Sequence, residues 1–316
     1  MNKEILNICQ VSLKGNIPTI NENIYEFKKH YSNLKIFIIC PKKEKKYFKK
    51  KIPFKFCKII NEDEILSLKK FKNISNKYFK KNTYKKEIQN RLSWYYQQIL
   101  KLSFLIKFTS TNKKKILMWD ADTILIKNFK FFEKDKTIKY GTTSEFHKAY
   151  FLTNKNILRK LPKYYLAFTN QFIGLTSSEN KFLVKKLNNY KKKNLQLSLW
   201  LTHIVMSSIS NTHKIFNGSM FSEQELIGQS SLLHAYNKQK LIHGLRSGLN
   251  GKLTNLQKKI TILLGYNYLS YEHTHQNINS QNMLKREQTW FSFLKIIIKK
   301  TSNKFFRGLK HKIIKI

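Results

Sequence analysis

The stretch Ile116–Leu125, ILMWDADTIL, decides which fold this chain is expected to adopt. It sets Asp120 and Asp122 directly after an apolar run with the length and composition of a buried strand. Acidic residues are scarce in the chain, which has 18 Asp and Glu against 61 Lys and Arg. Two carboxylates this close together, at the end of a buried strand, therefore need a chemical explanation.

The expected strand places Asp120 and Asp122 at the carboxyl edge of a sheet, where open α/β sheets bind their ligands. On an extended chain, residues i and i+2 point to the same face, where two carboxylates repel unless a cation neutralises them. Mg²⁺ is typically held by one or two carboxylates plus substrate phosphates, and Mn²⁺ uses similar oxygen ligands. The pair thus predicts a metal–diphosphate site. The alternative is a turn in which both side chains cap local backbone amides.

Strands and helices alternate along the chain, which predicts an α/β fold with a mostly parallel sheet flanked by helices. No internal repeat and no Pro/Gly linker is visible, so a single domain is the simplest interpretation. The acidic cluster at 61–64 is interpreted as the start of a helix. The expected strands cover residues 5–9, 35–40, 54–60, 115–119, 171–175 and 266–270. The expected helices cover residues 24–31, 43–50, 84–108, 179–190, 195–207 and a segment after 221.

Composition narrows the classes of protein to consider. A content of 41% hydrophobic residues excludes a disordered chain. The net charge of +43 invites a nucleic-acid interpretation, but the lysines are spread through nearly every segment. We therefore expect anionic partners of another kind, namely a nucleotide diphosphate and an anionic membrane surface.

The cysteines and the hydropathy pattern predict a cytoplasmic location. Cys9, Cys40 and Cys57 show no C-x-x-C spacing, and two of them lie in apolar strand-like runs, which is typical of buried reduced thiols. The first residues lack the apolar stretch of a signal peptide, and no run approaches the roughly 20 apolar residues of a membrane span.

The longest helical pattern carries polar side chains that are candidates for donor binding. Gln97, Gln98 and Lys101 fall within about one helical turn, and Arg91 lies one or two turns earlier. Such a strip on an aromatic helix suits a phosphate and a base. The alternative is a helix whose apolar face packs while its Gln and Lys side chains meet solvent.

The segment Phe221–Glu225, FSEQE, contains the candidates for a catalytic carboxylate. Ser222 and Glu225 have the spacing of a capping box, in which each side chain satisfies a backbone amide. Glu223 has no such structural reason, so it is the preferred general base for deprotonating an acceptor hydroxyl. Glu225 is the second candidate, and a structural role for both is the alternative.

Three motifs, taken together and in this order, resemble bacterial glycosyltransferases of the DUF6492 type. The Asp motif by itself resembles the D-x-D segment of glycosyltransferases with the GT-A fold. The resemblance runs from about residue 3 to about residue 275 and implies a GT-A-like, Rossmann-like fold. The motifs are WYYQQILKL (94–102), WDADT (119–123) and FSEQELIG (221–228).

The resemblance also implies roles for single residues. It assigns Asp122 to the metal and Asp120 to the donor ribose or the metal, and it favours a donor-binding role for the 91–101 strip. A C-terminal histidine often returns to the metal in this fold, which makes His273 a candidate ligand and His243 its equal rival. Histidines are expected within 168–173, and their absence puts any acceptor-side role for Asn170 and Gln171 in doubt.

The last part of the chain is aromatic, aliphatic and basic. Residues 1–285 are expected to form the catalytic domain, and residues 286–316 a basic amphipathic helical tail. Segments of this kind lie in the headgroup region of anionic membranes. The alternative is a solvated basic helix that completes the core.

The resulting prediction is a metal-dependent glycosyltransferase of the hexosyltransferase type. It would use Mn²⁺ or Mg²⁺ to move a sugar from a nucleotide-diphosphate donor to a cell-surface glycan or lipid-linked acceptor, such as a lipopolysaccharide or capsule precursor. It would lie peripherally on the inner face of the cytoplasmic membrane. The alternatives are a nucleotidyl- or phosphotransferase with the same Asp–metal site, and a non-catalytic basic protein that binds nucleic acid.

Overall fold

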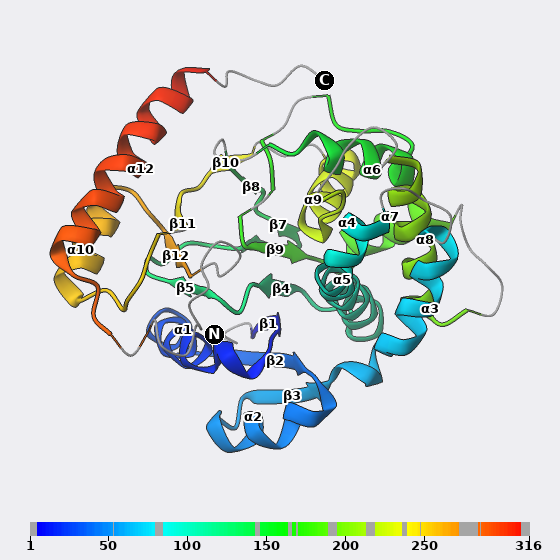
Figure 1. Ribbon diagram of the computed structural model, residues 1–316, viewed down its shortest axis with the longest axis horizontal. Coiled ribbons are helices and arrows are strands. Elements are labelled where there is room, and N and C mark those ends of the chain that lie inside the picture. The colour runs from blue at the N-terminus through cyan, green and yellow to red at the C-terminus, as the bar shows by residue number, and fades with distance from the viewer. Residues whose placement is uncertain are drawn as a thin grey trace.

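A five-stranded sheet forms the centre of the molecule (Figure 1). The computed structural model describes residues 5–52, 54–79, 85–142, 146–163, 166–168, 170–188, 195–212, 219–235, 239–246, 248–271, 284 and 286–310, with only the backbone for 85, 86 and 301–310. The strand order is β3-β2-β1-β4-β9. All neighbours are parallel except β9, which is antiparallel to β4. The strands are β1 (Leu6–Val11), β2 (Leu34–Cys40), β3 (Cys57–Asn61), β4 (Ile116–Trp119) and β9 (Phe172–Leu175).

Both faces of this sheet are buried, which explains why its strands read as nearly continuous apolar runs. Alternate residues of one strand enter different cores. On β1, Ile8 packs with α1 and α2, whereas Cys9 packs with the helices of the opposite face. The first face is covered by α1 (Ile17–His30) and α2 (Lys45–Lys51).

A larger helical layer covers the second face of the sheet. The longest of these helices is α5, whose buried residues contact β1 and β4. The helices of the layer are α3 (Leu68–Phe79), α4 (Lys85–Asn90), α5 (Leu92–Asn112), α6 (Lys148–Leu158), α7 (Ser177–Leu187), α8 (Leu197–Thr212) and α9 (Glu223–His234).

A three-stranded sheet of order β11-β12-β5 continues from the end of β4. Two helices, α10 and α12, pack on it through a separate apolar cluster, and Figure 1 shows them side by side. The elements of this part are β5 (Thr123–Leu125), β11 (Gly244–Arg246), α10 (Asn255–Leu263), β12 (Tyr268–Ser270) and α12 (Trp290–Lys310). Four two-residue strands complete the described structure: β6 (Phe132–Glu133), β7 (Lys136–Thr137), β8 (Tyr140–Gly141) and β10 (Lys240–Leu241).

The predicted fold class is confirmed: the protein is α/β, with a mostly parallel, Rossmann-like sheet flanked by helices. The predicted helix over 84–108 is interrupted, because α4 ends at Asn90 and α5 begins at Leu92. The acidic cluster does start a helical turn, a 3-10 turn over Glu62–Glu64 that Asn61 caps. None of the described helices is long and apolar enough to cross a membrane.

Candidate functional site

The two aspartates lie on a tight turn between β4 and β5. The Thr123 N–H donates to the Asp120 carbonyl at 3.1 Å, and the Trp119 indole N–H donates to the Thr123 carbonyl at 2.8 Å. The turn is also fixed to β9, since the Asp120 N–H donates to the Gln171 carbonyl at 2.9 Å. The pair therefore sits at the carboxyl edge of β4, where ligands of parallel sheets bind.

The expectation of an extended chain between the two aspartates is wrong. The chain reverses between Asp120 and Thr123, so the two side chains have different surroundings. Asp120 points to α5 and α9, where its Oδ1 accepts from the Lys101 Nζ at 2.5 Å and its Oδ2 from the Gln224 amide at 3.2 Å. Asp122 accepts from the Thr123 hydroxyl at 3.2 Å and is half-buried. The turn alternative was right about the backbone, and the Asp120 carboxylate binds the side chains of Lys101 and Gln224.

Lys101 is the buried cation that joins the two acidic motifs. Its Nζ lies 2.5 Å from Asp120 and 3.2 Å from the Glu223 Oε1. Burial by itself would lower the pKa of Lys101, but the two carboxylates raise it above its ordinary value, so the side chain stays protonated. The alternative, in which Gln and Lys of this helix meet solvent, is therefore wrong for Lys101 and for Gln98, which are both buried.

One face of α5, together with Arg91 directly before it, lies along the segment that leads into α9. Arg91, at the start of α5, donates to the Ser219 hydroxyl, and the Tyr95 hydroxyl accepts from the Met220 N–H at 3.2 Å. One turn further on, the Gln98 Oε1 accepts from the Glu223 N–H at 3.3 Å. The three sequence motifs, far apart in the chain, thus meet at the end of β4. Gln97 is half-buried and lies off this face.

Glu223 is a fully buried carboxylate with hydrogen-bonding capacity to spare. Neither of its oxygens has a hydrogen-bond partner of acceptable geometry, although the Lys101 cation is within ion-pair distance. Burial raises the pKa of Glu223 to about 7, the nearby Lys101 lowers it in part, and Asp120 raises it further. A carboxyl group with this pKa can take up and release a proton near neutral pH, as a general base must. The side chain is not exposed at the helix start, as the sequence suggested, but lies beneath it.

Glu225 forms only half of the predicted capping box. The Ser222 hydroxyl accepts from the Glu225 N–H, as expected. The Glu225 carboxylate does not return to the Ser222 amide; it accepts from the buried Phe168 N–H at 2.7 Å and from the Gln229 amide at 3.0 Å. The reason is that the Phe168 amide is buried and requires an acceptor. Burial raises the pKa of Glu225 to about 7.

The histidine candidates lie in different places. The His243 carbonyl accepts from the Asn267 N–H. The Asn267 carbonyl in turn accepts from the N–H of Ile126, just after the last residue of β5, whereas Asp122 lies just before its first residue. The backbone of His243 therefore lies toward the other end of β5. His273 lies outside the described residues. The described chain stops nearby at Tyr271, whose N–H donates to the Asp122 carbonyl at 2.9 Å.

Sequence reasoning missed Gln10, a buried polar residue at the carboxyl end of β1. Its side-chain nitrogen and oxygen both lack a hydrogen-bond partner, which is unusual for buried polar groups. The register of β1 with β4, Cys9 opposite Met118, places Gln10 beside Trp119 and one step from the Asp120 turn. The available signal was a lone amide within the otherwise apolar 8–11 run.

The side chains at the turn can hold a metal ion only if a substrate and water supply the other ligands. Asp120 is engaged by Lys101 and Gln224, and the half-buried Asp122 carboxylate accepts from the Thr123 hydroxyl. Within the described ranges, no group of three or more His, Cys, Asp and Glu side chains is placed to hold a metal ion. Mg²⁺ and Mn²⁺ accept a single carboxylate when substrate phosphates and water supply the remaining ligands.

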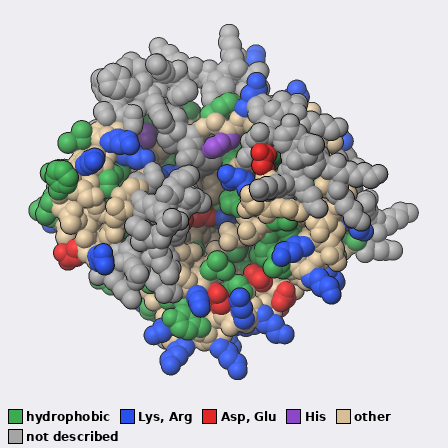
Figure 2. All heavy atoms as spheres, viewed as in Figure 1, with side chains coloured by type: hydrophobic (Ala, Val, Ile, Leu, Met, Phe, Trp, Pro, Cys, Tyr) green, Lys and Arg blue, Asp and Glu red, His purple; other side chains and the backbone are tan. Residues whose placement is uncertain are grey.

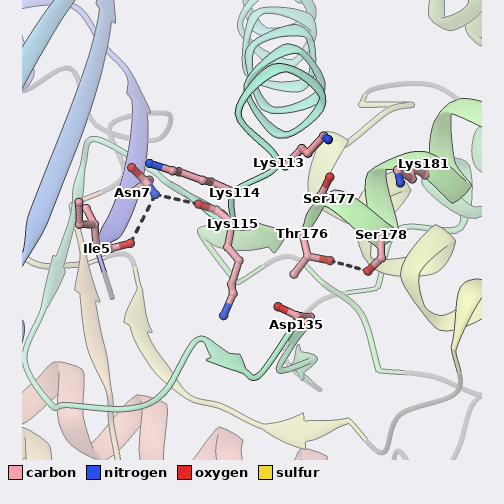
Figure 3. Close-up of a pocket in the computed structure, with 10 residues that line it drawn as sticks. All are labelled: Ile5, Asn7, Lys113, Lys114, Lys115, Asp135, Thr176, Ser177, Ser178 and Lys181. Carbon is pink, nitrogen blue, oxygen red and sulfur yellow. Dashed lines mark hydrogen bonds between the residues drawn. The ribbon is translucent and has the colours of Figure 1, made fainter. Parts of the chain in front are cut away.

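The surface of the molecule is hollowed in several places. Figure 2 shows a hollow near the middle of this face, with acidic and basic side chains in it. A second hollow, of about 730 Å³, lies beside Lys115, which precedes β4 (Figure 3). Lysines and the hydroxyls of Thr176–Ser178 line it. It is at the amino end of the strand, where ligands of parallel sheets do not normally bind.

Comparison with known proteins does not assign the chain to a family. No model of a protein family matches the chain, and no curated protein matches it significantly. Among solved structures, apo mouse xyloside xylosyltransferase 1 aligns with 88% of this chain and 99% of its own, at 9% identity and a TM-score of 0.44. Nothing about substrate or residue roles is transferred from so distant a likeness. The resemblance to the DUF6492 type stays a prediction.

Proposed function

We propose that this protein is a GT-A-like glycosyltransferase that uses a nucleotide-diphosphate sugar as donor. The observation that carries the proposal is the meeting of the three motifs at the carboxyl end of β4. There Asp120, Lys101, Gln224 and Glu223 form one largely buried polar cluster. Burying Lys101 and Glu223 costs free energy, so a folding role alone explains the cluster poorly.

Each residue of the cluster has a proposed task. Asp122 would hold Mn²⁺ or Mg²⁺ together with the donor diphosphate, and the ion would withdraw charge from the leaving nucleotide. Lys101 and Gln224 hold Asp120 in one orientation, which suits a hydrogen bond to the donor ribose. Gln10 supplies unused hydrogen-bonding groups at the same edge. Glu223 is the candidate base for the acceptor hydroxyl, with Glu225 fixed in a structural contact.

The wider features of the proposal are those that the resemblance to glycosyltransferases of the DUF6492 type implies. The acceptor is a cell-surface glycan or lipid-linked precursor of the lipopolysaccharide or capsule kind, and the transferred sugar is a hexose. His273 would complete the metal shell, two residues after Tyr271. Arg91 and Gln97 would contact the donor at the entrance of the site. Such an enzyme works on the inner face of the cytoplasmic membrane.

The test is donor binding and hydrolysis by the Asp122→Asn variant. Asn keeps the shape of Asp122 but removes the charge that a cation requires, so Mn²⁺ should no longer raise the melting temperature in the presence of UDP- or GDP-sugars. Release of free nucleoside diphosphate should fall by at least about a hundredfold, since this stabilisation acts on the leaving group. Asp135→Asn, at the other end of the sheet, is the matched control and should behave as the unmodified protein.

Two results would contradict the proposal. Unchanged metal-dependent hydrolysis in Asp122→Asn would remove the site assignment. Release of pyrophosphate rather than nucleoside diphosphate would instead identify a nucleotidyltransferase that uses the same carboxylates.

A further inference from the structure

The helices α10 and α12 present an apolar face that nothing in the described structure covers. Among the described residues, the three most exposed large hydrophobic side chains all lie on these two helices: Leu263 at 85%, Phe291 at 82% and Ile298 at 68%. Leu256 of α10 and Leu294 of α12 are exposed as well. Isolated exposed apolar residues are ordinary, but a gathering on two neighbouring helices marks an interaction surface.

The spacing shows that this face is organised. On α10, Leu256 and Leu263 are seven residues apart, with Lys259 between them, so all three lie on one stripe. On α12, Phe291, Leu294 and Ile298 follow the same helical spacing. Each helix therefore has a second apolar stripe besides the one that it buries.

The buried stripe of α12 fixes the exposed one in place. Phe293 and Ile297 pack into the apolar cluster of the three-stranded sheet, together with Ile124 of β5. The outward residues of α12 thus sit on a folded support and do not belong to a loose tail. Since β5 begins directly after Asp122, this support also carries the candidate site.

The charges around the face identify its partner. Neither α10 nor α12 contains an acidic residue, and the chain has none from 290 to 316. The exposed lysines Lys259, Lys295 and Lys299 lie among the apolar residues. Figure 2 shows this combination at the left edge, where hydrophobic side chains gather over α10 and α12 beside lysines. A second copy of the chain would oppose lysine to lysine, whereas anionic headgroups neutralise them.

We propose that α10 and α12 together form a docking surface for an anionic lipid bilayer. The apolar stripes enter the boundary between headgroups and acyl chains, and the lysines contact the phosphates. The surface is wider than the tail at 286–316, because α10 contributes half of it. It does not depend on the proposed glycosyl transfer, since binding to lipid can be measured without donor or acceptor.

Trp290 is a natural reporter for this docking. It is 43% exposed at the start of α12, whereas Trp119 and Trp200 are buried and Trp94 is partly buried. On mixing with vesicles of phosphatidylcholine and phosphatidylglycerol, Trp emission should shift to the blue and be quenched by brominated acyl chains. Trp290→Phe should abolish both signals. Pure phosphatidylcholine vesicles should bind much more weakly, because the lysines gain nothing there.

The decisive variant is Leu263→Ser combined with Phe291→Ser. Both side chains are exposed, so the fold is not at risk, and vesicle affinity should fall about tenfold for each. The matched control is Tyr47→Ser on α2. Tyr47 is 43% exposed among the lysines of 45–51, but no second exposed apolar residue accompanies it there. This control should bind vesicles as the unmodified protein does.

Four outcomes would overturn the proposal. One is a loss of binding in Tyr47→Ser equal to that in the double variant, and a second is no loss in the double variant. Another is binding that added salt abolishes completely and that leaves Trp emission unchanged, which would indicate charge attraction by the whole surface alone. The last is a concentration-dependent doubling of mass, lost in the double variant and without vesicle binding, which would assign the face to a second copy of the chain.

Discussion

At the scale of single residues, Lys101 is the side chain on which the polar cluster depends. Met has a similar length, so Lys101→Met leaves Asp120 and Glu223 buried without a counter-ion and without a large cavity. Removal of one partner from a buried ion pair destabilises proteins by about 3–5 kcal/mol. We therefore expect Lys101→Met to lower the free energy of unfolding by about 3–5 kcal/mol, measured with urea at pH 8.

The controls for Lys101 use the same helix and the same cluster. Lys107→Met, on the exposed side of α5, should change the free energy of unfolding by less than about 0.5 kcal/mol. Adding Glu223→Gln to Lys101→Met should recover part of the loss, because one buried negative charge is then gone. A loss of equal size in Lys107→Met would show that helix packing, and not the charge, is at work.

Glu223 predicts how stability changes with pH. Its pKa of about 7 in the folded protein exceeds the ordinary 4.5, so the folded state binds this proton more tightly than the unfolded state. The resulting stabilisation is complete below pH 4.5 and is lost as the pH rises through 7. The Glu223→Gln variant has no such proton to lose. Its free energy of unfolding minus that of the unmodified protein should therefore rise by roughly 2 kcal/mol between pH 5 and pH 8.

Urea unfolding of both proteins at several pH values measures this difference. A variant that lacks an exposed carboxylate, Glu133→Gln, should show a constant difference over the same range. If the Glu223→Gln difference is also constant, Glu223 does not carry the raised pKa, and its suitability as a base at neutral pH is lost.

At the scale of elements, the position of α9 depends on Gly228. A Cβ at this position would lie 2.3 Å from the ring of Phe168, so the helix can approach that ring only because the residue is glycine. This contact fixes the helix whose first turn carries Glu223 and Gln224. The glycine that ends the FSEQELIG motif is therefore required by the packing of α9 against Phe168.

Gly228→Ala should destabilise the protein even though Ala favours helices by about 1 kcal/mol over Gly. Overpacking at Phe168 should outweigh that gain and give a net loss of roughly 1–3 kcal/mol by chemical unfolding. Phe168→Leu in the same chain should relieve the clash and recover part of the loss. An Ala variant that is more stable than the unmodified protein would contradict the close contact.

The sequence predicted most elements whose pattern is local. The apolar run 116–119, the helix that follows Ser222 and the capped acidic turn at 61–64 are all present, because period and caps are written in neighbouring residues. It did not predict the destination of Glu225, because the Phe168 amide that needs it lies 57 residues away in the chain. It also missed the burial of Lys101 for the same reason.

At the scale of the whole molecule, a net charge of +43 makes the folded chain repel itself. Salt screens this repulsion over about 10 Å at 0.1 M, whereas buried pairs such as Lys139 with Glu179 are affected much less. The melting temperature should therefore rise by several degrees between about 10 mM and 150 mM sodium chloride. This rise corresponds to a gain of roughly 1 kcal/mol or more in the free energy of unfolding. Thermal unfolding followed by circular dichroism measures it, and a falling melting temperature would show that surface ion pairs outweigh the repulsion.

The pairing of β5 with β12 has a consequence for how the protein is made. Thr123 follows the aspartate turn directly, but it pairs with Ser270 on β12. The Asp122 carbonyl likewise accepts from the N–H of Tyr271, which is synthesised much later. On the ribosome, the nascent chain thus carries an unfinished turn with an unpaired strand edge until residues 268–271 have emerged. Such edges are templates for aggregation. Prematurely terminated chains that stop before Ser270 should therefore accumulate as insoluble material, not as a smaller folded protein.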